Sequence, residues 1–465
     1  MKRIAICLLL TAVMSFAAGT KEHAGVSVDF GHGKLMVSDN HRYLIHADGT
    51  PFFYLGDTAW ELFNRLDREE ASRYLENRRA KGFTVIQAAV LAALDGLNTP
   101  NSYGDRPLID NNPNRPNEAY FKHVDAIVEM ARGKGIYMGL LPTWGDKVTK
   151  AYDSKGPIVF NETNAEQYGR FLGQRYKDYP NIIWILGGDR AADKVEPVWR
   201  AMVRGIKAGG DEHLMTYHPQ GRRTSADWFH NDAWLDFNML QSGHREVDMD
   251  NYRMIDMDYR RSPVKPCLDG EPRYENLPVK WRSEQWWFND FDVRQAAYWG
   301  LFAGAFGHTY GCHDIWQMKS PKWPAEIGAR GIWNESMDLP GAGQMLHVRR
   351  LMESRPVLER VPDQSIIKAS QQEDGRHLQA TRGGDYLMVY TPYGDTVQVD
   401  DGTISGTKRK VWWYNPRDGG AELIGEFGRG EKLQFDPPGE SQRGNDWVLV
   451  MDDADKKYGP PGAAK

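Results

Sequence analysis

Two carboxylates stand where apolar, strand-like runs of the sequence end. Asp189 follows Asn181-Ile-Ile-Trp-Ile-Leu-Gly-Gly, and Glu271 follows Lys265-Pro-Cys-Leu-Asp-Gly. Each run is typical of a parallel strand buried on both faces. The glycine before each acid lets backbone or ligand approach closely. Hydrolysis of a glycosidic bond needs two carboxyl groups, one to protonate the leaving oxygen and one to attack the anomeric carbon. The pair predicts this chemistry, with Asp189 as the acid/base and Glu271 as the nucleophile.

The elements that must position these acids alternate between strand and helix, the pattern of a parallel α/β fold. The expected strands span residues 52–56, 84–90, 136–141, 181–186, 214–217, 237–241, 265–269 and 308–311. The expected helices span residues 68–81, 118–132, 165–176, 195–207 and 293–306. Eight such units predict a (β/α)₈ barrel, in which residues at the carboxyl ends of the strands carry the chemistry. A doubly wound open sheet is the alternative, although no Gly-x-Gly-x-x-Gly follows the first strand.

Further side chains near the ends of these strands suit a hydroxyl-rich ligand, because amides and imidazoles bind hydroxyls and indole faces cover sugar C–H surfaces. We predict substrate contacts from Asp57, Trp60, Gln87, Trp144, Arg190, His218, Gln241, His244, Tyr310 and Trp316. The long loop over residues 99–117 is rich in Pro, Asn and Asp. It is expected to wall the same pocket, with loop variation of no functional meaning as the alternative.

The pattern divides the chain into four parts. Residues 1–18 have the features of a signal peptide: Lys2 and Arg3, an apolar run that is too short to span a bilayer, and Ser15-Phe16-Ala17. Residues 19–355 hold the barrel with an N-terminal extension. After Pro356 and Pro362, short alternating runs predict an antiparallel β-sandwich over residues 356–452. Its strands are expected at residues 377–381, 386–390, 396–399, 410–414, 432–435 and 447–451. Residues 453–465 are expected to be a flexible tail.

The composition restricts the partners. The formal net charge is −5 and no basic stripe occurs, which argues against nucleic acid. The signal predicts export to the periplasm or the medium, without a membrane anchor. Cys267 and Cys312, the cysteines outside the signal, fall on predicted core strands and are expected to be buried thiols. A bridge between them is the alternative, since the two strands are neighbours.

Two rival classes of protein remain open. A metal-dependent barrel hydrolase would need a His-x-His on the first strand, where this chain has Gly56-Asp57-Thr58, and its other histidines lack ligand spacing. We therefore predict no metal and no cofactor. A catalytically inactive carbohydrate-binding protein is the second rival, which the intact acid pair argues against. Serine hydrolase chemistry lacks support because no Gly-x-Ser-x-Gly occurs.

Several motifs resemble glycoside hydrolase family 140, the apiosidase-like (β/α)₈ barrels of gut Bacteroidota and related bacteria. They are Phe53-Tyr-Leu-Gly-Asp-Thr-Ala-Trp60, Asn181-Ile-Ile-Trp-Ile-Leu-Gly-Gly-Asp-Arg190, Asp269-Gly-Glu-Pro272 and Gly307-His-Thr-Tyr-Gly311 with Ile315-Trp-Gln317. The resemblance covers most of the chain. It implies a retaining mechanism with Asp189 as the acid/base and Glu271 as the nucleophile. It also implies release of β-linked apiose from galacturonic acid in the pectin rhamnogalacturonan II, so that the partner is a plant cell-wall glycan.

The resemblance leaves three points open. Glycines precede Asp189 where related retaining barrels have Asn-Glu, so the contact to the 2-hydroxyl of the sugar must come from elsewhere. A galacturonate would need a cation, for which Arg190, Arg106 and Arg115 are candidates. An exo-glycosidase of different sugar specificity is the alternative on the same barrel. The C-terminal sandwich is often labelled collagen-binding in this family, and nothing in these residues supports that label.

Overall fold

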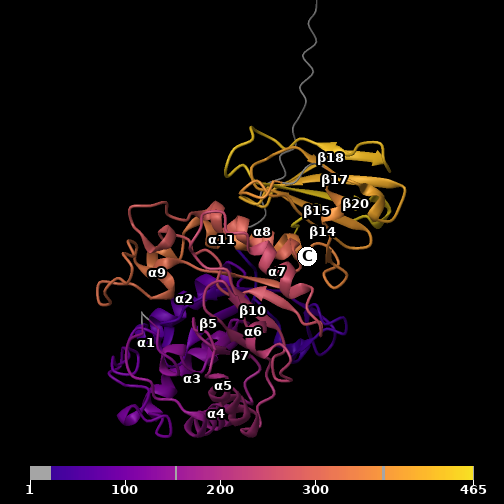
Figure 1. The fold of residues 1–465 in the computed structure, drawn as a ribbon. Helices are drawn as coiled ribbons and strands as arrows, with labels where there is room; N and C mark the ends of the chain where they lie inside the picture. Colours follow the sequence, from indigo (N-terminus) through magenta and orange to yellow (C-terminus); the bar gives the residue numbers. More distant parts are fainter. Residues whose placement is uncertain (1–21, 152–153, 369–371, 464–465) are drawn as a thin grey trace, which may run out of the picture.

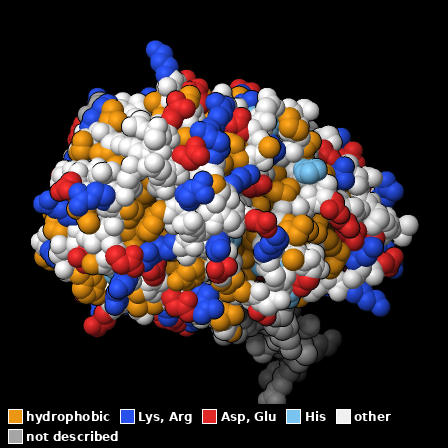
Figure 2. Space-filling model, turned by 90° about the horizontal axis from the view of Figure 1, so that it is seen from below, with side chains coloured by type: hydrophobic (Ala, Val, Ile, Leu, Met, Phe, Trp, Pro, Cys, Tyr) orange, Lys and Arg blue, Asp and Glu red, His pale blue; other side chains and the backbone are white. Residues whose placement is uncertain are grey.

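The computed structural model describes residues 22–151, 154–368 and 372–463. The predicted signal peptide lies outside the described residues. The chain forms a curled α/β layer with an antiparallel sheet domain stacked on its helices α8 and α11 (Figure 1). Within the described residues, no helix is long and apolar enough to cross a membrane. Figure 2 shows acidic and basic side chains interspersed on the face seen from below.

The two acids follow the carboxyl ends of parallel strands. In chain order they are β4 (Tyr54–Thr58), β5 (Val85–Ala89), β6 (Tyr137–Leu141), β7 (Ile182–Gly187), β8 (Met215–His218), β10 (Asn238–Gln241), β11 (Cys267–Asp269) and β12 (Gly307–Tyr310). Each overlaps a predicted strand. One sheet has the order β12-β4-β5-β6-β7-β8, and β10 pairs in parallel with β11 and antiparallel with β9 (Arg223–Thr224). This sequential order has no point of reversal, so the doubly wound alternative is wrong.

The two sheets meet at both seams through backbone hydrogen bonds. The amide of Asp236 donates to the carbonyl of Met215 at 2.9 Å, between β10 and β8. The amide of Phe306 donates to the carbonyl of Cys267 at 3.0 Å, between β12 and β11. The six-stranded sheet is thus a curled half-barrel. Strands β10 and β11 lie between its two edge strands, β8 and β12.

Helices cover the outer face of the curled sheet. The long ones are α2 (Arg68–Ala80), α3 (Glu118–Gly133), α4 (Glu162–Tyr176), α5 (Glu196–Ala208), α7 (Asn251–Tyr259), α8 (Asp290–Phe302) and α11 (Pro340–Glu353). Short ones are α1 (Leu62–Arg65), α6 (Ala226–Phe229), α9 (His313–Trp316) and α10 (Trp333–Ser336). Side-chain caps explain several starts: Asp67, Asn161 and Asn289 each form a reciprocal capping box with the residue three positions later.

An N-terminal antiparallel sheet of β1 (Leu35–Val37), β2 (Leu44–His46) and β3 (Pro51–Phe52) precedes β4. Its side chains Leu44 and Phe52 belong to the same buried cluster as Tyr54 and Tyr137 of the parallel strands. The sheet therefore closes the amino-terminal end of the strands, opposite the two acids.

The C-terminal domain is an antiparallel sheet of order β13-β14-β15-β20-β17-β18 with a smaller β16-β19 pair. The strands are β13 (Val361–Pro362), β14 (Gln379–Arg382), β15 (Tyr386–Thr391), β16 (Val397–Gln398), β17 (Lys408–Tyr414), β18 (Ala421–Gly428), β19 (Gln434–Phe435) and β20 (Trp447–Asp453). Strand β18 was not predicted, because most of its residues are at least partly exposed and its edge carries glutamates and glycines. The two faces of β15 alternate as expected: Tyr386, Met388 and Tyr390 join the core of the α/β layer, whereas Leu387 and Val389 join a separate core.

The end of the chain differs from the flexible tail that composition predicts. The hydroxyl of Tyr458 donates to Asp385 at 2.9 Å, and Arg355 donates to the carbonyl of Gly459 at 3.1 Å. Gly462 lies so close to Tyr414 that a Cβ there would meet its ring at 2.6 Å. An aromatic anchor and close glycine contacts thus place residues 453–463 against the sheet. Cys267 and Cys312 are both buried and free, so no bridge joins them.

A buried ion pair fixes the sheet domain to α8. Arg294 of α8 contacts Asp446, just before β20, at 2.9 Å, and both side chains are almost fully buried. The ring of Tyr298 stacks on Tyr390 at 4.9 Å. The indole of Trp299 donates to the carbonyl of His377 at 2.9 Å. The sheet domain is therefore an integral packing partner of the α/β layer.

Replacing Asp446 with alanine is expected to lower the free energy of unfolding by about 3 kcal/mol, because the Arg294 charge stays buried without this partner. Chemical denaturation measures the change. The double variant Arg294→Met with Asp446→Leu is the control and should lose less than the single variant, since it leaves neither charge behind. A single variant as stable as the native chain would contradict an integral interface.

Candidate active site

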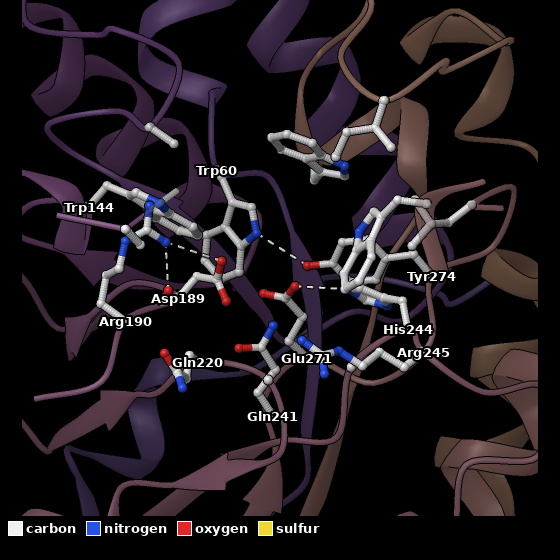
Figure 3. A pocket seen from close by; sticks show the side chains of 18 of the residues that line it. Trp60, Trp144, Asp189, Arg190, Gln220, Gln241, His244, Arg245, Glu271 and Tyr274 are labelled. Atoms are coloured by element: carbon white, nitrogen blue, oxygen red, sulfur yellow. Dashed lines mark hydrogen bonds and ion pairs between the residues drawn. The ribbon is translucent and has the colours of Figure 1, made fainter. Parts of the chain in front are cut away.

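A cavity of about 470 Å³ opens at the carboxyl ends of the parallel strands. Both predicted catalytic acids and six of the predicted contact residues line it: Asp189, Glu271, Trp60, Trp144, Arg190, Gln241, His244 and Trp316. Figure 3 shows the two carboxylates facing the same space, with Trp60 and Trp144 on the side of Asp189 and with His244 and Tyr274 on the side of Glu271. The predicted pair is thus brought together in one pocket.

Asp189 stands on a sharp turn after β7. Gly187 and Gly188 have φ values of 89° and 110°, and Asp189 itself has a φ of 52°. A Cβ on Gly187 would meet the carbonyl oxygen of His218 at 2.3 Å, and one on Gly188 would meet the ring of Trp144 at 2.9 Å. Only glycine fits both positions. The turn therefore points the carboxylate of Asp189 into the pocket, where Arg190 contacts it at 3.3 Å.

Glu271 is buried and lies within ion-pair distance of two imidazoles, of which that of His244 forms a hydrogen bond. Nε2 of His244 lies 3.0 Å from Oε1 of Glu271, and Nε2 of His218 lies 3.2 Å from Oε2. Burial would raise the pKa of Glu271, but the two imidazoles outweigh it and lower that pKa to about 2. Glu271 is therefore ionised at neutral pH, the state that a nucleophile requires.

His218 connects the two acids. The backbone amide of Asp189 donates to Nδ1 of His218 at 3.3 Å, so Nδ1 acts as an acceptor. In the neutral imidazole the proton then lies on Nε2, the atom that faces Glu271. His218 is fully buried beneath the pocket. His218 thus does not line the cavity, as a substrate contact would, and instead contacts Glu271.

Three other predicted contacts are wrong, because their side chains do not line the pocket and bond to other parts of the fold. Asp57 is fully buried against α2, where Arg78 and Tyr74 contact it at 2.5 and 2.6 Å. Gln87 points into the interior of the curled sheet and donates to Thr309 at 2.9 Å. Tyr310 donates to Glu275 at 2.6 Å. All three stabilise the fold beneath the site.

The long loop after β5 does not wall the pocket, since only Ala93 and Leu94, upstream of residues 99–117, line it. Arg115 is paired with Asp110, and Arg106 is also absent from the lining. Segments that follow β6, β7, β8, β10, β11 and β12 supply the walls instead. Sequence reasoning missed these lining residues: Asp146, Arg222, Arg245, Tyr274, Leu277, Trp281 and Ile327.

Tyr274 belongs to the centre of the site. The indole of Trp60 donates to its hydroxyl at 3.2 Å, and its ring lies 4.4 Å from that of His244. Burial raises the pKa of Tyr274 well above its ordinary value, so the hydroxyl stays neutral. Its position in Glu271-Pro-Arg-Tyr274, three residues after the acid, was the signal that could have found it.

In the described part of the chain, no group of three or more His, Cys, Asp or Glu side chains is arranged to hold a metal ion. What the site offers is an ionised, buried carboxylate, a second carboxylate across the cavity, and aromatic walls. A family model described as "Apiosidase-like, catalytic domain" matches residues 38–359.

The chain belongs to this family.

Two solved structures of glycoside hydrolases are similar to this apiosidase-like chain. One, described as "Glycoside hydrolase", is 40% identical, covers 92% of this chain and 99% of its own, and has a TM-score of 0.86. The other is a glycoside hydrolase family 5 protein from Bacteroides vulgatus ATCC 8482, 40% identical, covering 94% and 97% with a TM-score of 0.88. The apiosidase-like chain is therefore a glycoside hydrolase. No curated protein matches it. A second model, "Putative collagen-binding domain of a collagenase", matches residues 361–452.

Proposed function

We propose that this protein is a retaining, exo-acting apiosidase that removes β-linked apiose from galacturonic acid in rhamnogalacturonan II, as a member of glycoside hydrolase family 140. The observation that carries the proposal is the pair Asp189 and Glu271 facing one cavity, with Glu271 kept ionised by two imidazoles. The apiosidase-like family match over residues 38–359 supports the choice of sugar.

The proposed reaction has two steps. In the first, Asp189 protonates the glycosidic oxygen while the carboxylate of Glu271 attacks the anomeric carbon, so that the bond to the galacturonate breaks and a glycosyl ester forms. In the second, Asp189 takes a proton from water, the water oxygen attacks the same carbon, and the ester to Glu271 breaks. Two inversions leave the configuration of the sugar unchanged.

The scaffold for this reaction is proposed to be a (β/α)₈ barrel. The eight parallel strands, their sequential order and the backbone hydrogen bonds at both seams support closure. In such a barrel the acids of β7 and β11 would stand on opposite sides of the mouth, as double displacement requires.

The carboxylate of the galacturonate would be bound by cations other than the predicted Arg106 and Arg115. Arg222 and Arg245 line the cavity on loops that follow β8 and β10. Arg245 is exposed, and Arg222 is paired with Glu246 at 3.1 Å near the surface. Guanidinium groups at the mouth suit a carboxylate on the sugar next to the scissile bond.

Incubation with rhamnogalacturonan II side chains, trimmed of their outer sugars, tests the proposal. We expect release of free apiose, identified by chromatography, whose first-formed anomer in proton NMR is the β form. Release of a different monosaccharide, with apiosyl linkages untouched, would keep the glycoside hydrolase and reject the apiosidase. An inverted first anomer would reject the retaining mechanism.

Replacing His218 with alanine is expected to move the acid limb of the pH profile of kcat/KM to higher pH. His218 helps to lower the pKa of Glu271 to about 2, so its loss raises that pKa, and the nucleophile is protonated and inactive at pH values where the native enzyme still works. His32→Ala, in the short 3-10 helix that precedes β1 and remote from Glu271, is the matched control and should leave the profile unchanged. A lower kcat/KM at all pH values, with the acid limb at the same pH as in the native enzyme, would contradict this role for His218.

Export to the periplasm or medium is part of the proposal, on the basis of the signal features in residues 1–18. N-terminal sequencing of the native protein should find a start near Ala18. An intact Met1 on the mature protein would refute it.

A further inference from the structure

The turn that carries the acid/base leaves no room for a second polar side chain beside it. Gly187 and Gly188 are the two residues before Asp189, and any Cβ there would collide with the backbone of His218 or the ring of Trp144. Retaining glycosidases gain much of their rate from a hydrogen bond to the sugar 2-hydroxyl that strengthens in the transition state. In this protein another part of the pocket must supply that contact.

The end of β10 lies directly beside the nucleophile. The carbonyl of Leu240 accepts from the amide of Gly270 at 2.7 Å, and the amide of Gly243 donates to the carbonyl of Glu271 at 3.0 Å. These two bonds bracket Gln241 and place it opposite Gly270 and Glu271. The 2-hydroxyl is attached to the carbon next to the one that Glu271 attacks. A side chain at position 241 that enters the cavity is therefore near that hydroxyl.

A buried carboxylate locks this geometry. Oδ1 of Asp269 accepts from the amides of Ser242 and Glu271 at 3.2 and 3.3 Å, and Oδ2 accepts from the hydroxyl of Ser242 at 2.6 Å. The residues after β10 and after β11 thus form one rigid unit. Gln241 is held at a fixed position relative to Glu271 before any sugar binds, which is what preorganised transition-state binding requires.

The carboxamide of Gln241 is buried but uncommitted. Only 4% of the residue is exposed, and its Oε1 has no hydrogen-bond partner among the described residues. Figure 3 shows the amide rising from below into the space between Asp189 and Glu271. A buried polar group without a partner is costly unless a ligand satisfies it. The amide can both donate and accept, so a sugar hydroxyl is the natural partner.

We propose that Gln241 binds the hydroxyl on the sugar carbon next to the anomeric carbon, and that this bond strengthens in the transition state. The inference rests on the proposed function of the same pocket, but it names a contact that holds for whichever sugar is released. It also predicts selectivity: 2-deoxy sugars lose the benefit of Gln241.

The test is a double-deletion cycle, in which the amide of Gln241 is removed from the enzyme and the 2-hydroxyl from the substrate, singly and together. Gln241→Leu and the native enzyme are assayed on an aryl apioside and on its 2-deoxy analogue. We expect kcat/KM of the variant to fall about 100-fold on the hydroxylated substrate, mostly in kcat, and less than about threefold on the deoxy substrate. Gln220→Leu, an exposed amide at the rim of the same pocket, is the matched control and should change both substrates by the same factor.

Equal losses on both substrates would overturn the inference and indicate a structural role for Gln241. Unequal losses with Gln220→Leu, and equal ones with Gln241→Leu, would assign the contact to Gln220 instead. If the native enzyme releases a sugar other than apiose, the apiosidase proposal fails, and the same cycle is run on the aryl glycoside of that sugar. Thermal unfolding of each variant separates a lost contact from a lost fold.

Discussion

Replacing Glu271 with alanine is expected to lower kcat by about four orders of magnitude or more, which corresponds to ~5 kcal/mol of activation free energy. The variant lacks the group that forms the bond to the anomeric carbon, so neither step of the double displacement can proceed. KM should change much less. His218 and His244 lose their common partner, and Glu271→Gln, which keeps a side chain of the same shape, is the control for the fold.

Azide tests whether Glu271 is the nucleophile or is required for activity for another reason. The cavity left by the alanine admits azide, which attacks the anomeric carbon from the side that the carboxylate occupied. With an activated aryl glycoside the product should be a glycosyl azide of inverted configuration, formed in a single displacement. Proton NMR of this product checks the assignment. A retained glycosyl azide, or turnover within tenfold of the native enzyme, would show that another carboxylate is the nucleophile.

The position of the two acids was predictable because it depends on local patterns. A short apolar run followed by glycine and an acid identifies the end of a buried parallel strand, and parallel strands bring all their carboxyl ends to one edge. Asp189 and Glu271 needed no knowledge of distant contacts. The same logic placed Gln241 and His244 near the cavity, because both lie at or just beyond the end of β10.

The side of the strand on which a residue points was not predictable from its place near the end. Successive side chains alternate between the interior of the curled sheet and the helices. Asp57 and Tyr310 point outward to α2 and Glu275, and Gln87 points inward below the cavity. A polar residue on a strand can thus satisfy its hydrogen bonds within the fold, and only the three-dimensional arrangement distinguishes the two cases.

The lining residues that the sequence did not predict lie mostly on loops. Arg222, Arg245 and Trp281 reach the cavity from irregular segments whose paths depend on tertiary packing. The turn at Lys280 and Trp281 has φ values of 56° and 59°, which no local preference of these residues would predict. Strained positions of this kind persist only where the surrounding structure holds them.

Replacing Asp189 is expected to produce a different kinetic signature from replacing Glu271. Asp189 has a φ of 52°, where alanine would add strain, so Asp189→Gly is the cleaner deletion and Asp189→Asn the isosteric control. On a natural glycan, kcat should fall by about 10³- to 10⁴-fold, because the sugar leaving group needs protonation. On a dinitrophenyl glycoside, which leaves unaided, formation of the glycosyl ester should be nearly as fast as in the native enzyme.

The Asp189→Gly variant should therefore accumulate the ester on Glu271, visible as a burst of dinitrophenol and as a mass increase on the intact protein. Its slow step is attack by water without a base. Azide needs no base, so it should restore turnover of the activated substrate and give a glycosyl azide of retained configuration. The opposite anomeric outcomes at residues 189 and 271 assign the two roles independently. Loss of activity that is equal on both substrates and insensitive to azide would mean that Asp189 only orients Arg190 and the turn after β7, and that the acid/base lies elsewhere in the cavity.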